Sequence, residues 1–331
     1  MRKRRWMPEQ DQVPCIWILD EEWPDYELER QIFARALPWC DVVHSRPADY
    51  DRDFPAYGRR AVALLTQIDV RMTEERIAQL PCCCIISNYG TGFDNIDTAA
   101  AMARQILVTG VSGYCAAEIA QYVLSAIQEW ERPLHLYEQA VRNGLWGLAA
   151  VKAVHTFSKK ELFLVGFGCI GQAVAARARE SGLRVSAWSP SLTPAKAEAG
   201  GATYKELSDG LASADFVSLH LRYETATHHF IRAEQLRQMK KTAVLINTAR
   251  GSIVDTAALL QAVRRQEIAG AVLDVLPEEP PRPDDEVLHT PGILVTPHIA
   301  YYSPRALHEL RRRAAEHIVQ ALQETGKERF S

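Results

Sequence analysis

The sequence has few of the features that mark secreted, membrane or nucleic-acid-binding proteins. Its seven cysteines in 331 residues include no C-x-x-C pair, which argues against a disulfide scaffold and against the commonest zinc spacing. No uncharged apolar run is long enough to span a bilayer. The basic start MRKRR is followed by no apolar core, so we expect no secretory signal and a cytoplasmic protein.

An excess of charge of one sign is also absent. The chain has 38 Lys and Arg against 41 Asp and Glu, a net charge of −3, so neither nucleic acid nor a membrane is an expected partner. Cys82, Cys83 and Cys84 are consecutive in an apparent strand, where alternate side chains point to opposite faces. They cannot converge on one metal ion, so we expect buried thiols and no metal site.

Strands and helices alternate along the chain, which predicts α/β architecture with parallel sheets. At 331 residues, two domains are expected. Early strands are predicted at CIWILD, AVALLT and CCCIIS, and later ones at RVSAW, FVSLHL, AVLINTA, GAVLDV and ILVTPH. The segment PEEPPRPDDE is expected to be a surface loop of the second domain, and Ser303 and Pro304 are expected to open a closing helix.

The segment Leu162–Ala178 carries the most informative motif, an apolar strand that runs into a glycine-rich turn and then a helix. Gly166 would make the tight turn, Gly168 would let the main chain approach phosphate, and Gly171 would let the helix pack close to the strand. The free N–H groups of the helix start can receive a pyrophosphate. The motif therefore predicts a dinucleotide site.

A long helix is predicted at residues 117–130, with an apolar stripe at helical spacing. The spacing is compatible with a core helix, a bridge between domains or a subunit interface. The stripe consists of Ile119, Val123, Leu124, Ile127 and Trp130.

Five ordered motifs resemble the D-isomer-specific 2-hydroxyacid dehydrogenase family. They are YGTGFDNID, VGFGCIGQAVA, NTARGSIVD, LDVLPEEP and VTPHIAYYS. GTGFDNID and PHIAYYS are most similar to the C-terminal-binding-protein branch. The resemblance implies two domains: a Rossmann cofactor domain with a doubly wound parallel sheet, residues 118–301, inserted into a flavodoxin-like α/β substrate domain, residues 1–117 and 302–331. It also implies a homodimer in which residues 117–130 form the contact, with an intramolecular core helix as the alternative.

The reaction implied is the NAD(P)-dependent interconversion of a D-2-hydroxy acid and its 2-oxo acid. Such chemistry needs a base for the hydroxyl proton and a cation for the carboxylate. His298 matches the family's acid–base position, and Glu279 would bind its other ring nitrogen and fix the tautomer. Arg250 offers a planar fork for the carboxylate and the reacting oxygen. The catalytic set is therefore expected to be Arg250, Glu279 and His298.

The resemblance also implies which residues contact the two ligands. Asp274 would receive the nicotinamide carboxamide, and the N–H groups of Thr91 and Gly92 would bind the substrate carboxylate. The expected cofactor contacts are Gly166, Gly168, Cys169, Ile170, Gly171, Ser189, His220, Thr227, Thr248, Ala249 and Asp274. The expected substrate contacts are Tyr89, Gly90, Thr91, Gly92, Arg250 and Tyr301.

Departures from the family pattern refine these expectations. Glu279 stands where formate dehydrogenases carry glutamine, and Thr91 stands where phosphite dehydrogenases carry lysine. Arg222 replaces a usual proline and is either a charge near the cofactor or a solvent-facing side chain. An alternative function is a nucleotide-gated dimeric regulatory protein of the C-terminal-binding-protein type with little turnover.

The cofactor's identity depends on residue 189. NAD-selective folds place an acidic residue about twenty positions after the glycine turn, where it binds the adenosine ribose. Ser189 occupies that position here, so a 2′-phosphate would meet no repulsion. Pro190 and Ser191 stand where NADP-selective relatives usually have arginine, and Lys196 is the nearest following cation. We expect use of both NAD(H) and NADP(H), with a modest preference for NADP(H).

Overall fold

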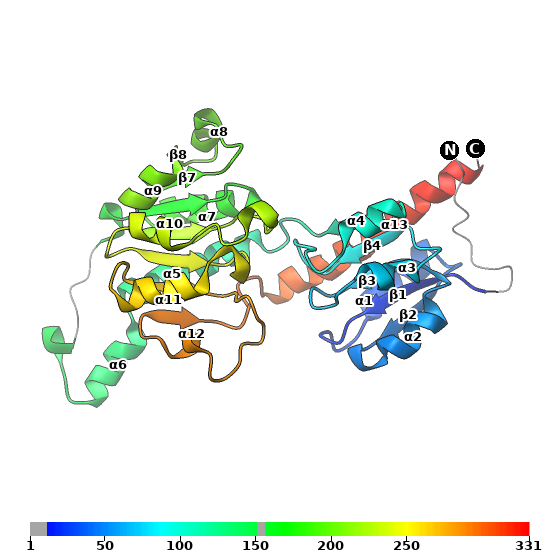
Figure 1. Cartoon of the computed structure of the whole chain (residues 1–331), viewed down its shortest axis with the longest axis horizontal. Coiled ribbons are helices and arrows are strands. Elements are labelled where there is room, and N and C mark those ends of the chain that lie inside the picture. The colour runs from blue at the N-terminus through cyan, green and yellow to red at the C-terminus, as the bar shows by residue number, and fades with distance from the viewer. Residues whose placement is uncertain (1–11, 151–155, 331) are drawn as a thin grey trace. The chain divides into compact units, whose positions relative to one another are not determined.

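The computed structural model describes residues 12–150 and 156–330, and the chain separates into two compact units (Figure 1). Unit 1 holds the chain up to Tyr114 together with Pro304 onward, and unit 2 holds Cys115–Ser303. Each division lies at the start of a helix. The assignment of unit 1 to the substrate and unit 2 to the cofactor stays a prediction.

Unit 1 contains a five-stranded sheet in which every pair of neighbours is parallel. Its strand order, β2-β1-β3-β4-β5, is the flavodoxin-like order, which confirms the predicted fold class. The strands are β1 (Cys15–Leu19), β2 (Asp41–Ser45), β3 (Ala61–Thr66), β4 (Ile85–Asn88) and β5 (Leu107–Gly110).

The helices of unit 1 include one from the far end of the sequence, α13, which packs against α1 and β4. Its buried face includes Leu310, Ile318 and Leu322. No helix among the described residues is both long enough and apolar enough to cross a membrane. The helices are α1 (Glu27–Ala36), α2 (Tyr50–Tyr57), α3 (Glu74–Ala78), α4 (Thr98–Ala103) and α13 (Pro304–Phe330).

Two sequence expectations for unit 1 need correction. Strands β2 and β5 were not predicted, because DVVHS and LVTG are too short and too polar to give an apolar run. Cys82–Cys84 do not lie in a strand: β4 begins at Ile85, and the N–H of Cys83 turns back to the carbonyl of Leu80 at 3.3 Å. Pro81 favours that turn. Cys82 and Cys83 are buried, as expected.

Unit 2 contains a seven-stranded parallel sheet in the order β12-β11-β10-β9-β6-β7-β8. Counted from β6, this is the Rossmann order extended by β12, so the predicted doubly wound sheet is confirmed. All five strands predicted after the glycine turn are present, and the two-residue β8 was missed. The strands are β6 (Glu161–Val165), β7 (Arg184–Trp188), β8 (Thr203–Tyr204), β9 (Phe216–Leu219), β10 (Val244–Asn247), β11 (Gly270–Leu273) and β12 (Ile293–Val295).

The helices of unit 2 connect these strands. The predicted surface loop is present as an exposed stretch between β11 and α12. The helices are α5 (Ala116–Glu131), α6 (Leu134–Arg142), α7 (Cys169–Glu180), α8 (Pro194–Ala199), α9 (Leu207–Ser213), α10 (Ala233–Gln238), α11 (Thr256–Arg264) and α12 (Glu286–His289).

The apolar stripe of α5 is part of the core of unit 2. Val123 and Ile127 are fully buried, and the helix packs against α7. The Trp130 ring lies against β11, where a Cβ on Gly270 would come within 2.3 Å of it. The buried stripe therefore favours the core-helix alternative for these side chains, and the expected dimer contact of residues 117–130 stays a prediction.

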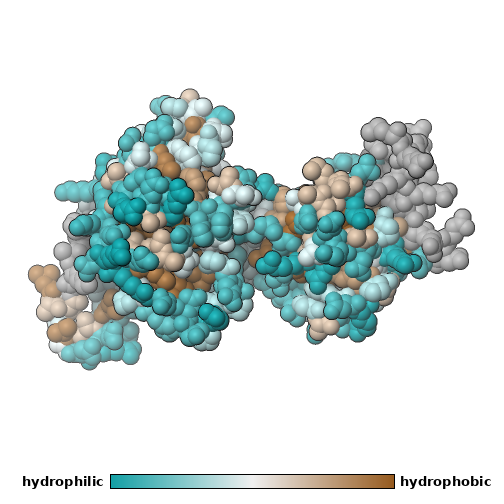
Figure 2. Space-filling model, in the orientation of Figure 1, coloured by the Kyte–Doolittle hydropathy of each residue, from teal (hydrophilic) through white to brown (hydrophobic). Residues whose placement is uncertain are grey.

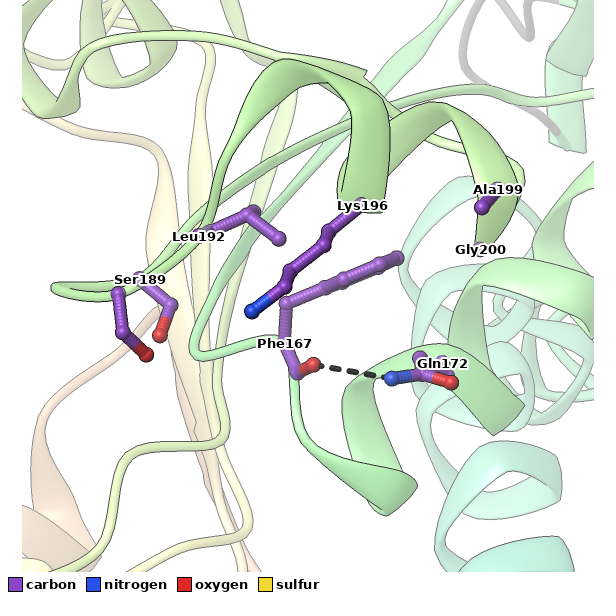
Figure 3. A pocket seen from close by; sticks show the side chains of 8 residues that line it. Phe167, Gln172, Ser189, Leu192, Lys196, Ala199 and Gly200 are labelled. Atoms are coloured by element: carbon purple, nitrogen blue, oxygen red, sulfur yellow. Dashed lines mark hydrogen bonds between the residues drawn. The ribbon is translucent and has the colours of Figure 1, made fainter.

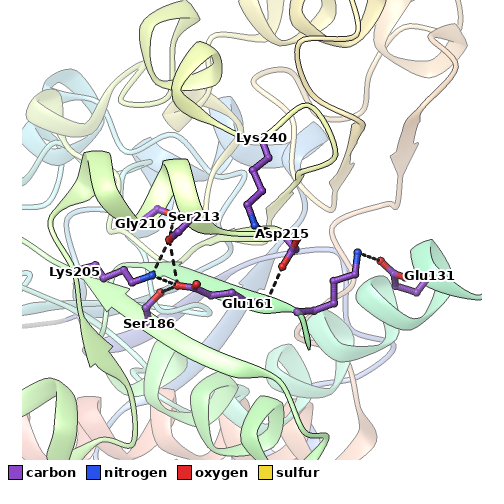
Figure 4. Close-up of polar contacts among 9 residues, drawn as sticks. Glu131, Glu161, Ser186, Lys205, Gly210, Ser213, Asp215 and Lys240 are labelled. Carbon is purple, nitrogen blue, oxygen red and sulfur yellow. Dashed lines mark hydrogen bonds and ion pairs between the residues drawn. The ribbon is translucent and has the colours of Figure 1, made fainter. Parts of the chain in front are cut away.

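A buried polar network lies at the start of β6 (Figure 4). The Glu161 carboxylate accepts hydrogen bonds from Ser186 at 2.6 Å and from the Lys205 ammonium at 2.5 Å. Its own N–H donates to Asp215 Oδ2 at 2.8 Å, and Lys240 pairs with the other Asp215 oxygen at 3.3 Å. These bonds tie together the amino-terminal ends of neighbouring strands, at the edge of the sheet away from the glycine turn.

Candidate active site

The glycine-rich turn has the geometry of a phosphate-binding turn. Gly166 has φ of +104°, which strongly favours glycine. A Cβ on Gly171 would lie 2.4 Å from the Gly166 carbonyl oxygen, so the helix packs directly on the turn. A Cβ on Gly168 would meet nothing within 4 Å, which leaves open space for a ligand. Helix α7 begins at Cys169, which is exposed, and continues with Ile170, so its first N–H groups lie at that space.

Two further predicted cofactor contacts follow neighbouring strands. The Thr248 hydroxyl, just after β10, is buried with no hydrogen-bond partner among the described residues, so it can bind a polar group of a ligand. The Ala249 N–H is bound by the Asn247 side chain at 3.0 Å. After β9, His220 lies 2.9 Å from the Ser218 hydroxyl, and burial lowers its pKa to about 4. These residues fit a dinucleotide held by neutral groups and main-chain donors.

A cavity of 410 Å³ lies beside the turn, at the end of β7 (Figure 3). Ser189 borders it, and the Lys196 side chain extends from α8 toward it. No carboxylate lines it, and Lys196 forms no ion pair with any residue that the structure describes. The cavity is therefore suited to an anion. Its lining residues are Phe167, Gln172, Ser189, Ser191, Leu192, Lys196, Ala199 and Gly200.

The predicted acid–base pair is formed in unit 2. His298 Nδ1 lies 2.7 Å from Glu279 Oε2, and the Leu276 N–H donates to Glu279 Oε1 at 2.8 Å. Burial alone would raise the pKa of Glu279, but its contacts with His298 and Leu276 and the charge of Arg250 lower it overall. The carboxylate is an acceptor only, so Nδ1 carries the hydrogen and Nε2 is left for a substrate.

Arg250 is brought to this pair by its loop. The Asn247 side chain donates to the Arg250 carbonyl at 2.9 Å, which fixes the turn after β10. A Cβ on Gly251 would lie 2.0 Å from the Leu276 carbonyl carbon, so only glycine allows the two loops to pack together. The guanidinium then lies near enough to Glu279 to influence its pKa. All three predicted catalytic residues are thus gathered in one unit.

Asp274 is hydrogen-bonded to the loop that carries His298. It is 2% exposed, and its carboxylate accepts hydrogen bonds from the Ile299 N–H at 2.9 Å, the Ala300 N–H at 2.8 Å and the Thr296 hydroxyl at 2.6 Å. The Asp274 carboxylate therefore holds this loop in place. Its expected contact with the nicotinamide carboxamide stays a prediction.

Two more predicted ligand contacts lie in loops of unit 2. Thr227 uses its hydroxyl within its own turn: it donates to the Arg222 carbonyl at 2.8 Å and accepts from the Glu224 N–H at 2.8 Å. The Thr227 hydroxyl therefore closes this turn, and the expected contact of Thr227 with the cofactor stays a prediction. Arg222 is exposed. The Tyr301 ring meets the His298 ring edge to face, with centroids 6.1 Å apart.

The predicted substrate loop of unit 1 follows β4. The Asn88 side chain donates to the Gly92 carbonyl at 2.7 Å and shapes the turn. A Cβ on Gly90 would lie 2.8 Å from the Ile68 side chain, so glycine allows a close approach there. Within the described residues, the N–H groups of Thr91 and Gly92 meet no acceptor. Two neighbouring donors are therefore available for an anion.

The Tyr89 side chain is buried in unit 1, and its expected contact with the substrate stays a prediction. It is 2% exposed, and its hydroxyl donates at 3.0 Å to Glu29, which is bound in turn by Arg311 at 2.6 Å. Burial raises the pKa of Tyr89 further above its usual value. Glu29 and Arg311 are far from Tyr89 in the sequence, so no local pattern showed that they would enclose it.

Sequence reasoning missed several residues that shape the site. Asn247 and Gly251 lie inside a motif that was identified, so that motif was the available signal. Asn88 closes β4 and could have been suspected from its position at a strand end. Tyr122 and Thr296, which join α5 to the His298 loop, gave no signal because their contact spans the whole of unit 2.

Comparisons with known proteins agree with this geometry. Residues 124–300 match the family model described as D-isomer specific 2-hydroxyacid dehydrogenase, NAD binding domain. The chain is 36% identical over 265 residues to a glyoxylate reductase of Korarchaeum cryptofilum, covering 79% of this chain and 77% of that protein. It is 31% identical over 265 residues to a glycerate dehydrogenase of Methylorubrum extorquens, covering 78% and 81%.

A solved structure shows the same fold. The D-lactate dehydrogenase of Aquifex aeolicus, complexed with NAD and lactic acid, matches with a TM-score of 0.82 at 24% identity, covering 94% of this chain and 96% of that one. The resemblance to the C-terminal-binding-protein branch and the regulatory alternative receive no support from these relatives. The sequence matches and the shared fold lead to one conclusion: the chain belongs to the D-isomer-specific 2-hydroxyacid dehydrogenase family.

Proposed function

We propose that this enzyme reduces small 2-oxo acids to D-2-hydroxy acids, with glyoxylate and hydroxypyruvate as the first substrates to test. The observation that carries the proposal is the His298–Glu279 pair at 2.7 Å, with Arg250 close to it in the same unit. Relatives named glyoxylate reductase and glycerate dehydrogenase support the choice of short acids.

The chain's own groups divide the work. Arg250 binds the substrate carboxylate and orients the keto oxygen. His298 Nε2 donates a proton to that oxygen in reduction and takes it back in oxidation. Glu279 keeps the other ring nitrogen protonated, and the N–H groups of Thr91 and Gly92 are proposed as further carboxylate donors. The bound nicotinamide supplies or accepts the hydride.

A substrate screen tests the reaction. Purified protein is given glyoxylate, hydroxypyruvate, pyruvate and phenylpyruvate with each reduced cofactor, and the nicotinamide absorbance is followed. We expect rapid turnover of at least one short acid. Cofactor-dependent capture of a peptide without useful turnover would instead favour a regulatory protein and contradict the proposal.

We propose that NADP(H) is the preferred cofactor and that NAD(H) is also used. Support comes from the cavity at Ser189, which contains the Lys196 cation and no carboxylate. Ser189 and Ser191 offer hydroxyl donors to a 2′-phosphate, and Lys196 offers the opposite charge. A nicotinamide cofactor suits the family, and the preference between the two forms is specific to these residues.

The ratio of kcat/KM for the two cofactors tests this preference. Ser189→Asp should shift the ratio toward NAD(H), because it adds a ribose acceptor and repels phosphate. Lys196→Gln should lower kcat/KM for NADPH about tenfold and leave NADH nearly unchanged. Lys241→Gln is the control, since this exposed lysine precedes β10 at the opposite edge of the sheet. Strong NAD(H) selectivity in the wild type would contradict the proposal.

We also propose that the protein forms a homodimer through an exposed apolar segment of unit 2. Several large hydrophobic side chains are exposed from α6 onward, with Trp146 at 81% and Leu148 at 90%. Brown and tan residues gather in the region of α6, at the lower left of Figure 2. So dense a cluster marks an interaction surface. We call it the arm, and it comprises Leu134, Leu136, Val141, Leu145, Trp146 and Leu148.

A further inference from the structure

His298 has a left-handed main chain, with φ of +52°. This conformation is unfavourable for a residue with a Cβ and persists only where the surroundings fix it. The His298 N–H donates to the Asp274 carbonyl at 2.8 Å, and the next two N–H groups donate to the Asp274 carboxylate. The His298 N–H also meets the Thr296 carbonyl at 3.0 Å. The main chain of residues 298–300 is therefore held by Asp274, through its carbonyl and its buried carboxylate, together with the Thr296 carbonyl.

The orientation of the Asp274 carboxylate is itself fixed by a hydrogen bond from the Thr296 side chain. The Thr296 hydroxyl has a single hydrogen, which it donates to Asp274 Oδ1 at 2.6 Å. Tyr122 Oη lies 2.5 Å from the same Thr296 oxygen. Since the Thr296 hydrogen is used, Tyr122 must be the donor and Thr296 the acceptor.

Tyr122 is suited to this permanent donor role. It lies in the middle of α5, whose apolar stripe is anchored in the core against α7. Burial raises the pKa of Tyr122 to about 12, so its hydroxyl keeps its hydrogen at any working pH. The hydrogen bonds thus all point in one direction, from α5 to the loop that carries His298.

We propose that Tyr122 and Thr296 are positioning residues for His298, acting through Asp274. They hold the loop so that Nδ1 stays on Glu279 and Nε2 stays available to the substrate. This inference rests on the proposed role of His298 as the acid–base group. Neither residue touches the imidazole, so their effect must pass through the main chain of residues 298–300.

Kinetics give the first test. Tyr122→Phe keeps the ring and removes one hydrogen bond, so kcat should fall about fivefold to tenfold while dinucleotide affinity stays within about twofold. Thr296→Val should cost more, about 10- to 50-fold, because it leaves Asp274 short of a donor and Tyr122 without an acceptor. Thr296→Ser keeps the hydroxyl and should restore kcat to within about twofold of wild type.

The double variant shows whether Tyr122 and Thr296 act through one chain of hydrogen bonds or independently of each other. Tyr122→Phe combined with Thr296→Val should have nearly the kcat of Thr296→Val alone, because both changes break the same path. Ser125→Ala is the matched control: it removes an exposed hydroxyl from the same helix, whose one hydrogen bond within the described part of the chain is to the Gln121 carbonyl at 3.0 Å. It should leave kcat unchanged.

A spectroscopic test needs no turnover. In histidine-labelled protein, long-range proton–nitrogen spectra report which ring nitrogen carries the hydrogen, and a His298→Asn variant assigns the His298 signals. We expect a single Nδ1–H form in the wild type and in Ser125→Ala, and a mixture of forms in Tyr122→Phe and Thr296→Val. The readout holds even if the proposed reaction fails.

The possible outcomes are distinct. A wild type that turns over no 2-oxo acid, with the tautomer changes present, would overturn the proposed reaction and leave the positioning role standing. Unchanged tautomer and kcat in both Tyr122→Phe and Thr296→Val would overturn the positioning role. Losses of kcat that add strictly in the double variant would also overturn the positioning role. So would a loss of kcat in Ser125→Ala as large as in Tyr122→Phe. Matching circular dichroism spectra establish that each variant is folded.

Discussion

Glu279 is held at both oxygens, by His298 on one side and the Leu276 N–H on the other. A carboxylate fixed in this way cannot rotate to suit a displaced imidazole, so the geometry of the pair is set before substrate binds. The His298 side chain is 24% exposed, so the ring is not sealed within the core. Substitutions of single residues should therefore separate the acid–base step from substrate binding.

Replacing the acid–base group removes proton transfer. His298→Ala should lower kcat by about 100-fold or more, the usual contribution of a positioned acid–base group. Dinucleotide affinity, measured by nicotinamide fluorescence, should change less than about twofold, because His298 lies outside the glycine turn. Near-normal turnover would show that another group transfers the proton.

The partner of the histidine should have a milder effect. Glu279→Gln keeps a side chain of the same shape but removes the charge that favours the imidazolium. Reduction needs that protonated ring, so the alkaline limb of the kcat–pH profile should move to lower pH. The profile is recorded for wild type and variant over the same pH range. An unchanged profile would remove Glu279 from the mechanism.

The guanidinium of Arg250 should matter for its shape as well as its charge. Arg250→Lys keeps the positive charge and loses the two-pronged donor, so KM for the 2-oxo acid should rise and kcat should fall. Arg250→Ala should be worse in both parameters. Wild-type kinetics in both variants would place carboxylate recognition elsewhere.

At the scale of elements, the strand ends of unit 2 have separate tasks. The carboxyl ends of β6, β9 and β10 lead into the glycine turn, His220 and Arg250, where open parallel sheets bind ligands. The Glu161 network lies instead around the amino-terminal end of β6, and Ser186 and Lys205 reach it from β7 and from the residue after β8. The residues of the Glu161 network and the proposed site residues therefore lie at opposite edges of one sheet. A substitution in one set should leave the other set unchanged.

The network at the amino-terminal edge should support stability only. Lys205→Met leaves the buried Glu161 without its cation, so the free energy of unfolding at pH 7 should fall by about 3 kcal/mol. Burial opposes ionisation of Glu161, but Lys205 and Ser186 lower its pKa overall. Denaturant unfolding measures the loss, and kcat should stay unchanged.

The sign of this effect sets its pH dependence. A carboxyl group with a lowered folded pKa stabilises fully above its unfolded pKa and loses that effect as pH falls through the folded value. In Lys205→Met the ammonium no longer offsets burial, so the pKa of Glu161 rises above its unfolded value. The difference between wild type and Lys205→Met should therefore shrink as the pH falls from 7 and vanish below the lowered pKa of the wild type. Lys241→Met, at an exposed lysine, is the control and should cost less than about 0.5 kcal/mol. A difference that does not change with pH would contradict the assignment.

At the scale of the whole molecule, the arm is the surface that we propose for dimerisation. Trp146→Glu together with Leu148→Glu places two charges on side chains that are 81% and 90% exposed. Light scattering should show a dimer for the wild type and a monomer for this variant, since charges are disfavoured in an interface core. Met102→Glu, at a side chain of unit 1 that is 74% exposed, is the control and should stay dimeric. A monomeric wild type would contradict the proposal.

The sequence predicted well those features whose residues are close together along the chain. The glycine turn, the five strands after it and the motifs of Arg250, Glu279 and His298 all rest on local patterns. Short polar strands such as β2 were missed, because their neighbours in the sheet supply the burial that their own residues do not indicate. The burial of Tyr89 by Glu29 depends on contacts between distant segments, which no periodicity contains.

Cys169 offers an experimental handle. All seven cysteines are described, and Cys169 is the exposed one, at the first residue of α7 in the glycine turn. A thiol-selective fluorescent reagent at limiting concentration would therefore attach first beside the proposed pyrophosphate position. Bound dinucleotide would cover the thiol and slow the labelling, so the rate of dye attachment reports occupancy of the site without any substrate.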